Sequence, residues 1–520
     1  MKKRSPSGNV SDRVAGSATF HLTECYSSPT VVQAAPVVVG WKLLSASLLF
    51  DQNKDNFPII MNHFIKKSLS VSCIGLAITN TAFAKWPTYR ADNRRSGSTA
   101  QTIKLPLTKS WNHQGGIPQQ AWTGPAKWDT YAKNAGLQSM RNFDPCYYTT
   151  IADGKLYYGS SSDNAVHCFD INSGKELWTF FTNSAVRFPP SLANNRAFFG
   201  SDDGHAYAVD TTNGNLIWKV NAAPTTQNII NNGKLISTHP VRTGITLVGD
   251  QAIFAGSLLP WEDSYLHAVT QKSGKSTYVK KAHGKEEKVR GYNQAHTGVT
   301  LQGAILTDNK HLYIPQGRAA ALKFDVKSGN TLGNMGHAGG VFCILTEDSQ
   351  LIAGPSSQKN RNDQISLTDQ KGRSIAAFNN ANRAVIYKGQ AFMHINGSLK
   401  GLDYTTYSSL SAKRADTIVA ANKIKKTNKP KYDQLMAEVK GLDTEIKACS
   451  MWETPAAAIA ELIVAGDHLI CGFDGKVEIY DTKSGKSLWS APIEGIAHGL
   501  SVSDGHLVVS TNKGEIISFK

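Results

Sequence analysis

The sequence predicts an all-β repeat fold, and three observations lead to this class. Residues 152–180, ADGKLYYGSSSDNAVHCFDINSGKELWTF, form short runs of alternating apolar and polar residues joined by turn residues. Residues 194–220, NNRAFFGSDDGHAYAVDTTNGNLIWKV, repeat this pattern, and aligning Gly214 with Gly174 gives a period of about 40 residues. The chain also holds 44 glycines, which fits a turn-rich protein. Because such a period is typical of one four-stranded blade, we predict a β-propeller.

Six further copies of the unit follow these two and predict eight blades in all. They lie at 246–280, about 303–335, about 340–378, 384–403, 462–492 and 498–520. The eighth copy lacks an outer strand, whereas residues 105–114 form an orphan strand that carries Trp111. Pairing the two would close the ring and leave no long open edge. We therefore predict an eight-bladed ring closed by an N-terminal strand.

The turns of each copy share a small set of residues. Asp-Gly and Asn-Gly pairs suit type I′ hairpins, whose central residues both have positive φ, and Ser-Gly or Asn-Gly is expected to do the same in the last hairpin. A carboxylate four residues before that last Gly can cap the turn, as Asp170, Asp210, Asp325 and Asp481 are placed to do. A Trp four residues after it should pack against the next blade: Trp178, Trp218 and Trp489. We interpret all of these residues as scaffold, and the copy at 246–280 has lost its Trp.

The N-terminal part of the chain contains a secretory signal. Residues 61–84 combine a positive start at Lys66 and Lys67, an apolar stretch and an Ala-Phe-Ala cleavage site. We expect residues 1–60 to be a non-native or disordered extension, residues 61–84 to be the signal peptide and residues 85–520 to be the propeller. The alternative is that 1–60 form a genuine cytoplasmic tail. Because no other apolar stretch is long enough to span a bilayer, the mature chain is expected to be periplasmic or secreted, without a transmembrane segment.

Charge and cysteine usage limit the classes of partner. The net charge of +16 allows an anionic partner. However, the sequence has no basic run interleaved with aromatics and no recognition-helix pattern, so nucleic acid is not expected. The seven cysteines form no CxxC, CxxCH or adjacent pair, which excludes attached haem and a zinc ribbon. If the chain is exported, a disulfide is allowed, but its pairing does not follow from the sequence.

Residues 405–451 interrupt the repeats between the sixth and seventh copies. Within them, 431–448 place Leu435, Val439, Leu442 and Ile446 on one face, which predicts an amphipathic helix. One interpretation of this helical insertion is a flap packed on the propeller. The other is a docking surface for a partner or a lid over the axial face.

The repeat unit, G-S-x-D-G-x-x-Y-A-V-D-x-x-x-G-x-x-x-W, resembles the pyrroloquinoline-quinone (PQQ) repeat over roughly residues 85–520. Residues 199–204, 240–244 and 315–318 further resemble PQQ-binding-like β-propeller repeat proteins. The resemblance implies a PQQ-type propeller and export. Relatives include quinoprotein alcohol dehydrogenases and the propeller lipoprotein of the outer-membrane β-barrel assembly machinery. The dehydrogenases usually add an adjacent Cys-Cys pair and a calcium site. This chain has no Cys-Cys, and its sequence shows no motif for the calcium ligands, so PQQ with calcium is the less favoured cofactor and no metal site is assigned.

Candidate binding residues lie in the loops between blades, at the mouth of the axial channel. Five arginines there could converge on one anionic ligand, namely Arg141, Arg187, Arg242, Arg290 and Arg318. The alternative is that each bonds to backbone carbonyls or a neighbouring Asp. Further candidates in the same loops are Asp144, Glu262, Tyr265, Tyr292 and Gln316, with His296 and His337 as candidate bases.

Two functions are compatible with these features. The first is an exported module of the cell envelope that binds an anionic small molecule or an envelope protein on its axial face. The alternative is a PQQ-dependent oxidoreductase. No catalytic residue is assigned, because the chain has no G-x-S-x-G, H-E-x-x-H or phosphate-binding loop.

Overall fold

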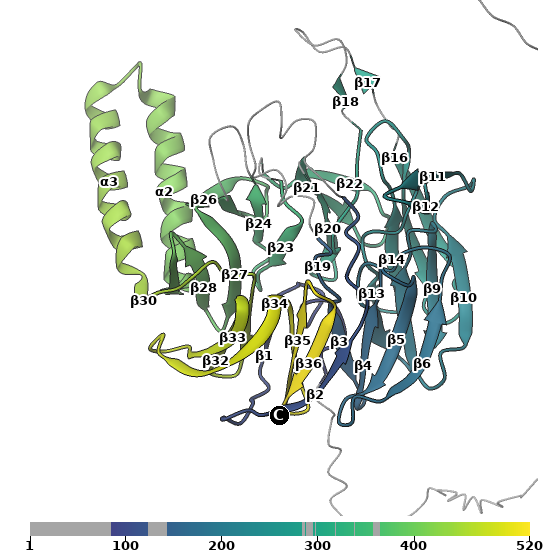
Figure 1. Cartoon of the computed structure of the whole chain (residues 1–520). Helices are drawn as coiled ribbons and strands as arrows, with labels where there is room; N and C mark the ends of the chain where they lie inside the picture. The colour runs from purple at the N-terminus through teal and green to yellow at the C-terminus, as the bar shows by residue number, and fades with distance from the viewer. Residues whose placement is uncertain are drawn as a thin grey trace, which may run out of the picture. The chain divides into compact units, whose positions relative to one another are not determined.

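The computed structural model describes residues 85–122, 143–282, 286–287, 295–296, 298–317, 319–336, 339–356 and 364–520. All of them belong to one compact unit, Thr79–Lys520. The predicted extension and signal peptide, residues 1–84, lie outside the described residues. In the described part the fold is almost entirely β, with one pair of helices (Figure 1).

Six blades are separate four-stranded antiparallel sheets. Blades one to three are β3 (Thr149–Ala152), β4 (Lys155–Gly159), β5 (Ala165–Asp170) and β6 (Glu176–Phe181); β7 (Ser191–Ala193), β8 (Arg196–Gly200), β9 (His205–Asp210) and β10 (Leu216–Asn221); and β13 (Thr246–Val248), β14 (Gln251–Gly256), β15 (Ser264–Thr270) and β16 (Ser276–Ala282). Blades four to six are β19 (Leu306–Thr307), β20 (His311–Gln316), β21 (Ala319–Asp325) and β22 (Thr331–Asn334); β23 (Phe342–Leu345), β24 (Leu351–Ser356), β25 (Gln364–Thr368) and β26 (Ser374–Asn379); and β27 (Ala381–Tyr387), β28 (Gln390–Ile395), β29 (Ser398–Asp403) and β30 (Ser450–Pro455).

Blades seven and eight are joined because one long strand, β34 (Ser487–Ser503), is the outer strand of the first and the inner strand of the second. Blade seven begins with β31 (Glu461–Ala465), β32 (His468–Gly472) and β33 (Asp474–Asp481), and blade eight continues with β35 (His506–Thr511) and β36 (Glu515–Phe519). The fourth strand of blade eight is β2 (Lys109–Gln114), which pairs antiparallel with β36. The prediction of eight blades closed by the N-terminal strand is therefore confirmed.

Tryptophans on several outer strands connect one blade to the next. The Trp111 indole donates from Nε1 to the Ile171 carbonyl at 2.7 Å. Its ring lies against Gly174, where an added Cβ would come within 2.6 Å of it. Trp178, Trp218 and Trp452 likewise donate to the carbonyl three residues before the turn glycine of the following blade. In the blade that lost its Trp, Tyr278 packs on Gly329 instead.

The predicted turn chemistry is confirmed in part. The Asp170 carboxylate caps its turn by accepting from the Ser173 backbone N at 2.8 Å. Asp153-Gly154 has φ of 53° and 73°, as the type I′ turn requires. The expectation that Ser-Gly does the same in the last hairpin is wrong, because only Gly174 has positive φ there. The turn is longer, with the Gly174 N donating to the Asp170 carbonyl, so one left-handed residue is enough.

Residues 86–99, which we call the plug, cross the axis at one end of the ring. The plug bonds to the far ends of the inner strands of the blades: its backbone pairs with Ile151 in blade one and Leu345 in blade five. Its last residues, β1 (Ser98–Thr99), pair parallel with β31 in blade seven. The Arg95 guanidinium is 2% exposed and donates from Nε to the Ile305 carbonyl at 3.0 Å. The plug thus fastens several inner strands together, a role that the sequence did not predict.

The insertion consists of two antiparallel helices, α2 (Tyr404–Ile424) and α3 (Lys429–Ala448), which lie inside blade six between β29 and β30. The placement between the sixth and seventh repeats was therefore wrong by one strand, because the outer strand of blade six follows the helices. α2 packs on β26, β28 and β29, and Figure 1 shows both helices beside the blades. Among the described residues, no helix has the length and apolar character that a membrane span needs.

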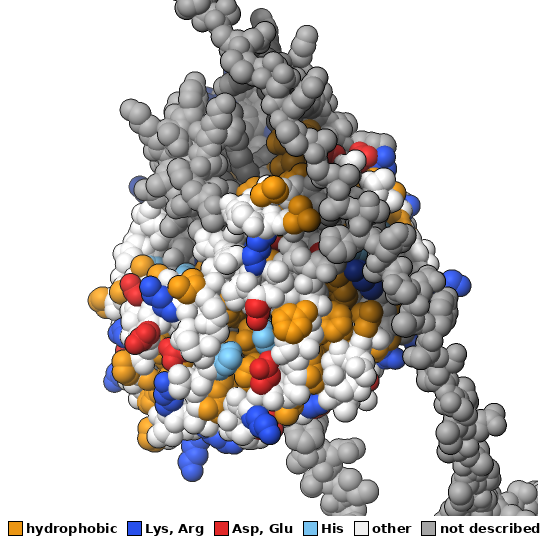
Figure 2. Space-filling view, turned by 45° about the vertical axis from the view of Figure 1, so that its right-hand side comes forward, with side chains coloured by type: hydrophobic (Ala, Val, Ile, Leu, Met, Phe, Trp, Pro, Cys, Tyr) orange, Lys and Arg blue, Asp and Glu red, His pale blue; other side chains and the backbone are white. Residues whose placement is uncertain are grey.

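The core lies between neighbouring blades. Its largest cluster of buried side chains joins blades seven, eight and one with Trp86 of the plug. On the outer strands some hydrophobic side chains remain exposed, among them Phe181 at 67%. Figure 2 shows hydrophobic, basic and acidic side chains interspersed over the face of the ring that it displays.

Candidate functional site

Four charged residues form a buried chain at the end of the ring opposite the plug. Asp144 precedes β3, Arg187 and Arg242 precede the inner strands β7 and β13, and Asp202 lies in the turn between β8 and β9. The plug binds where the inner strands end, so residues that precede these strands lie at the other end of the channel. We call Asp144, Arg187, Asp202 and Arg242 the ion network.

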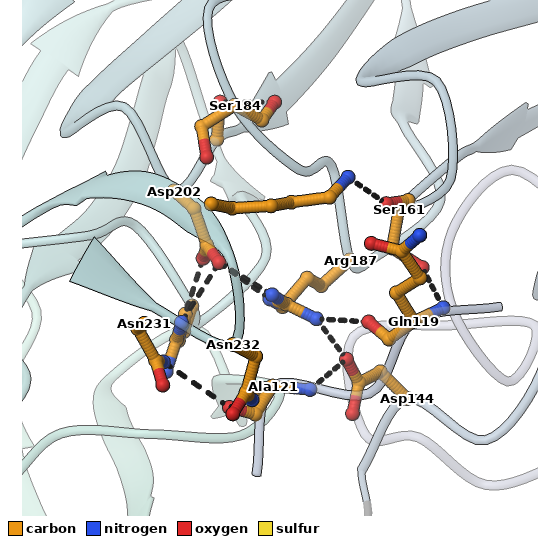
Figure 3. Close-up of polar contacts among 12 residues, drawn as sticks. Gln119, Ala121, Asp144, Ser161, Ser184, Arg187, Asp202, Asn231 and Asn232 are labelled. Carbon is orange, nitrogen blue, oxygen red and sulfur yellow. Dashed lines mark hydrogen bonds and ion pairs between the residues drawn. The ribbon is translucent and has the colours of Figure 1, made fainter. Parts of the chain in front are cut away.

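Asp202 is the centre of the ion network. It accepts from Arg242 Nε at Oδ1 and from Arg242 Nη2 at Oδ2, both at 2.7 Å. It also accepts from Nε and Nη2 of Arg187 at 2.7 and 2.6 Å. Arg187 Nη1 donates to Asp144 Oδ2, which adds Asp144 to the network (Figure 3). The four side chains are at most 5% exposed, and their two positive and two negative charges balance.

The pKa values of the two carboxylates in the ion network are shifted in opposite directions. Burial by itself raises the pKa of Asp202, but the guanidiniums of Arg187 and Arg242 outweigh it and hold that pKa well below its usual value. For Asp144 burial prevails over the attraction of Arg187, and its pKa is raised. Among the described residues, Asp144 Oδ1 and Arg242 Nη1 are buried without a hydrogen-bond partner.

Residues 115–122 cover the ion network. The Gln119 carbonyl accepts from Arg187 Nη1 at 2.8 Å, and the Ala121 N donates to Asp144 Oδ2 at 2.9 Å (Figure 3). The Trp122 ring lies 5.5 Å from the Arg242 guanidinium carbon, within the range of a cation–π contact. The network and its cover therefore form one rigid, charge-balanced unit.

The structure brings together three of the predicted site residues, Asp144, Arg187 and Arg242. Gln316 is connected to them through Gln302, which accepts from Trp122 Nε1 at 3.1 Å and forms a β-bridge with Gln316. Glu262 is half-buried in the loop between β14 and β15, where its backbone N donates to the Leu259 carbonyl at 3.1 Å. The side chains of Arg141, Arg290, Tyr292, Arg318, His296 and His337 lie outside the described residues.

Asp202 is the site residue that the sequence analysis missed. The Asp-Gly pair within Gly-Ser-Asp-Asp-Gly at 200–204 predicts a turn, which needs only one carboxylate. Asp203 fills that role, since its Oδ1 accepts from the His205 N at 3.0 Å. The turn leaves Asp202 without a role, and this extra Asp is the sequence feature that could have pointed to the ion network.

The described side chains provide neither a cluster of His, Cys, Asp and Glu for a metal ion nor a cysteine pair. Among them there is no group of three or more His, Cys, Asp or Glu placed to hold a metal ion. The five cysteines that the structure describes are all buried and free: Cys146, Cys168, Cys343, Cys449 and Cys471. No chemical step through PQQ follows from these residues.

The repeated blades and their tryptophan contacts define a β-propeller of the PQQ-repeat class. The family model described as "Outer membrane protein assembly factor BamB" matches residues 120–382, which is half of the chain. The chain therefore belongs to this family, which confirms the resemblance to PQQ-repeat propellers seen in the sequence. Comparison with curated proteins found no match.

The similar solved structures include two dehydrogenases and a BamB protein. Quinohemoprotein alcohol dehydrogenase from Comamonas testosteroni is 11% identical with a TM-score of 0.55, over 84% of this chain and 80% of that one. A europium-containing methanol dehydrogenase is 12% identical with a TM-score of 0.53, over 82% and 89%. BamB from Moraxella catarrhalis is 13% identical with a TM-score of 0.45, over 80% and 98%. At such identities the similarity shows the fold alone.

Proposed function

We propose that this protein is an exported propeller that binds a protein partner in the cell envelope and serves outer-membrane protein assembly. The family description supports the assembly role, and the predicted signal peptide supports export. The observation that carries the proposal is a hairpin outside the blades with an exposed apolar face.

This hairpin consists of β11 (Asn228–Asn231) and β12 (Lys234–Ser237). Ile230 and Leu235 are cross-strand partners and are 81% and 58% exposed. The adjacent pair is Ile229 and Ile236, which points to the other face because side chains alternate along a strand, and Ile236 is buried. In a half-buried antiparallel hairpin the outer face is normally polar. An apolar pair there fits a surface that a partner covers.

The hairpin is held in place beside the ion network. Asn231 and Asn232 both donate from Nδ2 to the Ala121 carbonyl, at 3.3 and 3.1 Å. Lys234 Nζ donates to Asn164 Oδ1 at 2.7 Å and to the Ser161 carbonyl in blade one. These contacts fix the hairpin before binding, so a partner does not have to bear the entropy of ordering it. Ile117 in the covering segment is likewise exposed, at 66%.

The described arginines of this end favour a protein partner over a small anion. Arg187 and Arg242 share the charge of Asp202, and Arg187 also neutralises Asp144. A second anion would have to compete with these buried carboxylates for the charge of the two guanidiniums. In this proposal the ion network is the rigid floor of a protein-binding surface.

The test is photo-crosslinking in intact cells. A photoreactive amino acid replaces Ile230, and in a control it replaces Phe181, which is 67% exposed on the outer strand of blade one. We expect position 230 to crosslink to a component of the outer-membrane assembly machinery and position 181 not to. Equal crosslinking at both positions, or a failure of position 230 to crosslink, would overturn the proposal.

The PQQ-dependent oxidoreductase remains the alternative because two of the similar folds are dehydrogenases. Purified protein titrated with PQQ and Ca²⁺ would be followed by absorbance and by dye reduction. Stoichiometric binding with dye reduction would replace the binding-module proposal, and its absence would support it.

A further inference from the structure

A second set of polar residues lines the channel across the axis from the ion network. Arg383, Glu461 and His498 belong to the inner strands β27, β31 and β34 of three consecutive blades. Phe342 begins the inner strand of blade five, and Tyr148 directly precedes that of blade one. The guanidinium carbons of Arg383 and of Arg90 in the plug both lie over the Phe342 ring, 5.1 and 4.9 Å from its centre, so this set lies directly beside the plug.

Glu461 and Arg383 do not form an ion pair with each other. Glu461 forms an ion pair with Arg90 of the plug, and both side chains are 4% exposed. Arg383 Nη1 donates to the Asn382 carbonyl at 2.8 Å, and its guanidinium carbon lies 5.1 Å from the Phe342 ring centre. Among the described residues Arg383 has no carboxylate partner, and its buried Nε has no hydrogen-bond acceptor. This contrasts with Arg187 and Arg242, which share Asp202.

Near Arg383 the imidazole of His498 and the hydroxyls of Tyr89 and Tyr148 are neutral, whereas the charge of Glu461 is paired with Arg90. Burial, and next the charge of Arg383, lower the pKa of His498 to about 4, so the imidazole is uncharged at neutral pH. His498 Nδ1 is buried and has no partner among the described residues. Burial raises the pKa of Tyr89 to about 12 and raises that of Tyr148 well above its usual value, so both hydroxyls keep their protons.

Buried polar groups normally have hydrogen-bond partners, and an unpaired one costs about 1–3 kcal/mol. A guanidinium that retains its charge without a carboxylate calls for an anion in particular. Its planar fork matches the oxygens of a carboxylate or a phosphate. The free donor atoms of this set are thus of the kind that an oxyanion would satisfy.

We propose that the axial channel binds a small oxyanion, a carboxylate or a phosphate, through Arg383 Nε and the His498 imidazole. The ligand would lie between the inner strands of blades six and eight, over the ion pair of Arg90 and Glu461. This site is separate from the hairpin of the proposed function and does not depend on it.

The test measures anion binding by the purified full chain with isothermal titration calorimetry at neutral pH. The probes are inorganic phosphate and succinate, with chloride as the reference anion. We expect saturable binding of at least one oxyanion, and the stronger of the two identifies the ligand class. We expect Arg383→Gln to weaken it at least tenfold. Arg373→Gln is the control, because Arg373 lies on the rim and pairs with Asp369 and Asp416; it should bind like the wild type.

Two further variants keep the test decisive. Arg383→Lys retains the charge and loses the fork, so binding should weaken less than in Arg383→Gln, which separates recognition from folding. His498→Phe removes the neutral donor and should weaken binding several-fold. If neither oxyanion binds, or if the Arg383 variants bind like the wild type, the proposal is overturned.

Discussion

Replacing Asp202 with Asn removes the one charge that two buried arginines share. The change keeps the size of the side chain but leaves the guanidiniums of Arg187 and Arg242 with a single remaining carboxylate, Asp144. Breaking a buried ion pair from one side costs about 3–5 kcal/mol, and here four contacts of 2.6–2.7 Å are weakened together. We therefore expect Asp202→Asn to lower the free energy of unfolding by about 4 kcal/mol. That is a large part of the roughly 5–15 kcal/mol that holds a typical domain together.

Urea denaturation at pH 7, followed by tryptophan fluorescence, measures this loss. Asp210→Asn is the matched control, since Asp210 caps an exposed turn of the same blade by accepting from the Thr212 N at 2.7 Å. Because Asn keeps the Oδ1 acceptor that caps this turn, Asp210→Asn should change the free energy of unfolding little. If Asp202→Asn destabilised the protein no more than Asp210→Asn does, Asp202 would not be needed to balance the buried charges of Arg187 and Arg242, and this reasoning would be refuted.

Asp202→Asn should also change how the stability of the protein depends on pH. Because the pKa of Asp202 is held below its unfolded value of about 3.9, its contribution is fully present above that pH and is lost as the pH falls toward the folded pKa. The raised pKa of Asp144 acts in the opposite sense, because ionising Asp144 above about pH 4 costs stability. Asp202→Asn should therefore lose less stability than the wild type when the pH is lowered from 5 to 3. A parallel loss in both proteins would contradict this assignment.

Two other predictions concern stability. In Tyr278→Trp the indole N–H should reach the Val326 carbonyl, three residues before Gly329, as the tryptophans of other outer strands do. We expect the free energy of unfolding in a urea titration to rise by about 1 kcal/mol. A fall would contradict the view that Tyr278 takes the place of a Trp. Burial, and next the charge of Lys520, lower the pKa of His506 to about 4, so its stabilising contribution should be lost as the pH falls from about 6.5 to 4, by on the order of 2–3 kcal/mol. His506→Gln should flatten the stability curve over that range, and an unchanged slope would contradict the assignment.

The ring could be predicted because its signals are local. Most copies repeat the same kind of hairpin turn within about 40 residues, and several also repeat the Trp spacing, so the repeats could be counted from the sequence. The outer strand β2 was recognised because it carries Trp111 without a repeat of its own. Trp452 was missed, since helices α2 and α3 replace the turn that marks the Trp elsewhere.

The site was predictable only as a set of candidates, because its energetics depend on contacts between distant segments. Arg187 and Arg242 were recognised as loop arginines, but Asp202 is 15 residues from one and 40 from the other. Nothing local distinguishes an arginine whose charge is already balanced from one that is free. Arg383 was not a candidate at all, because it lies within a strand and only the ring brings it beside His498.

The closure of the ring also has a kinetic consequence. The Thr108 and Lys520 backbones bond to each other in both directions although they are 412 residues apart, and the plug pairs with strands of blades that are synthesised much later. During synthesis, residues 86–114 therefore emerge before the blades, and β1 and β2 find their strand partners, β31 and β36, last. Such long-range pairing slows folding, and it leaves the backbone edges of β1 and β2 unpaired in the meantime. The segment that fastens the finished ring is thus also the part of the chain that is longest at risk of aggregation.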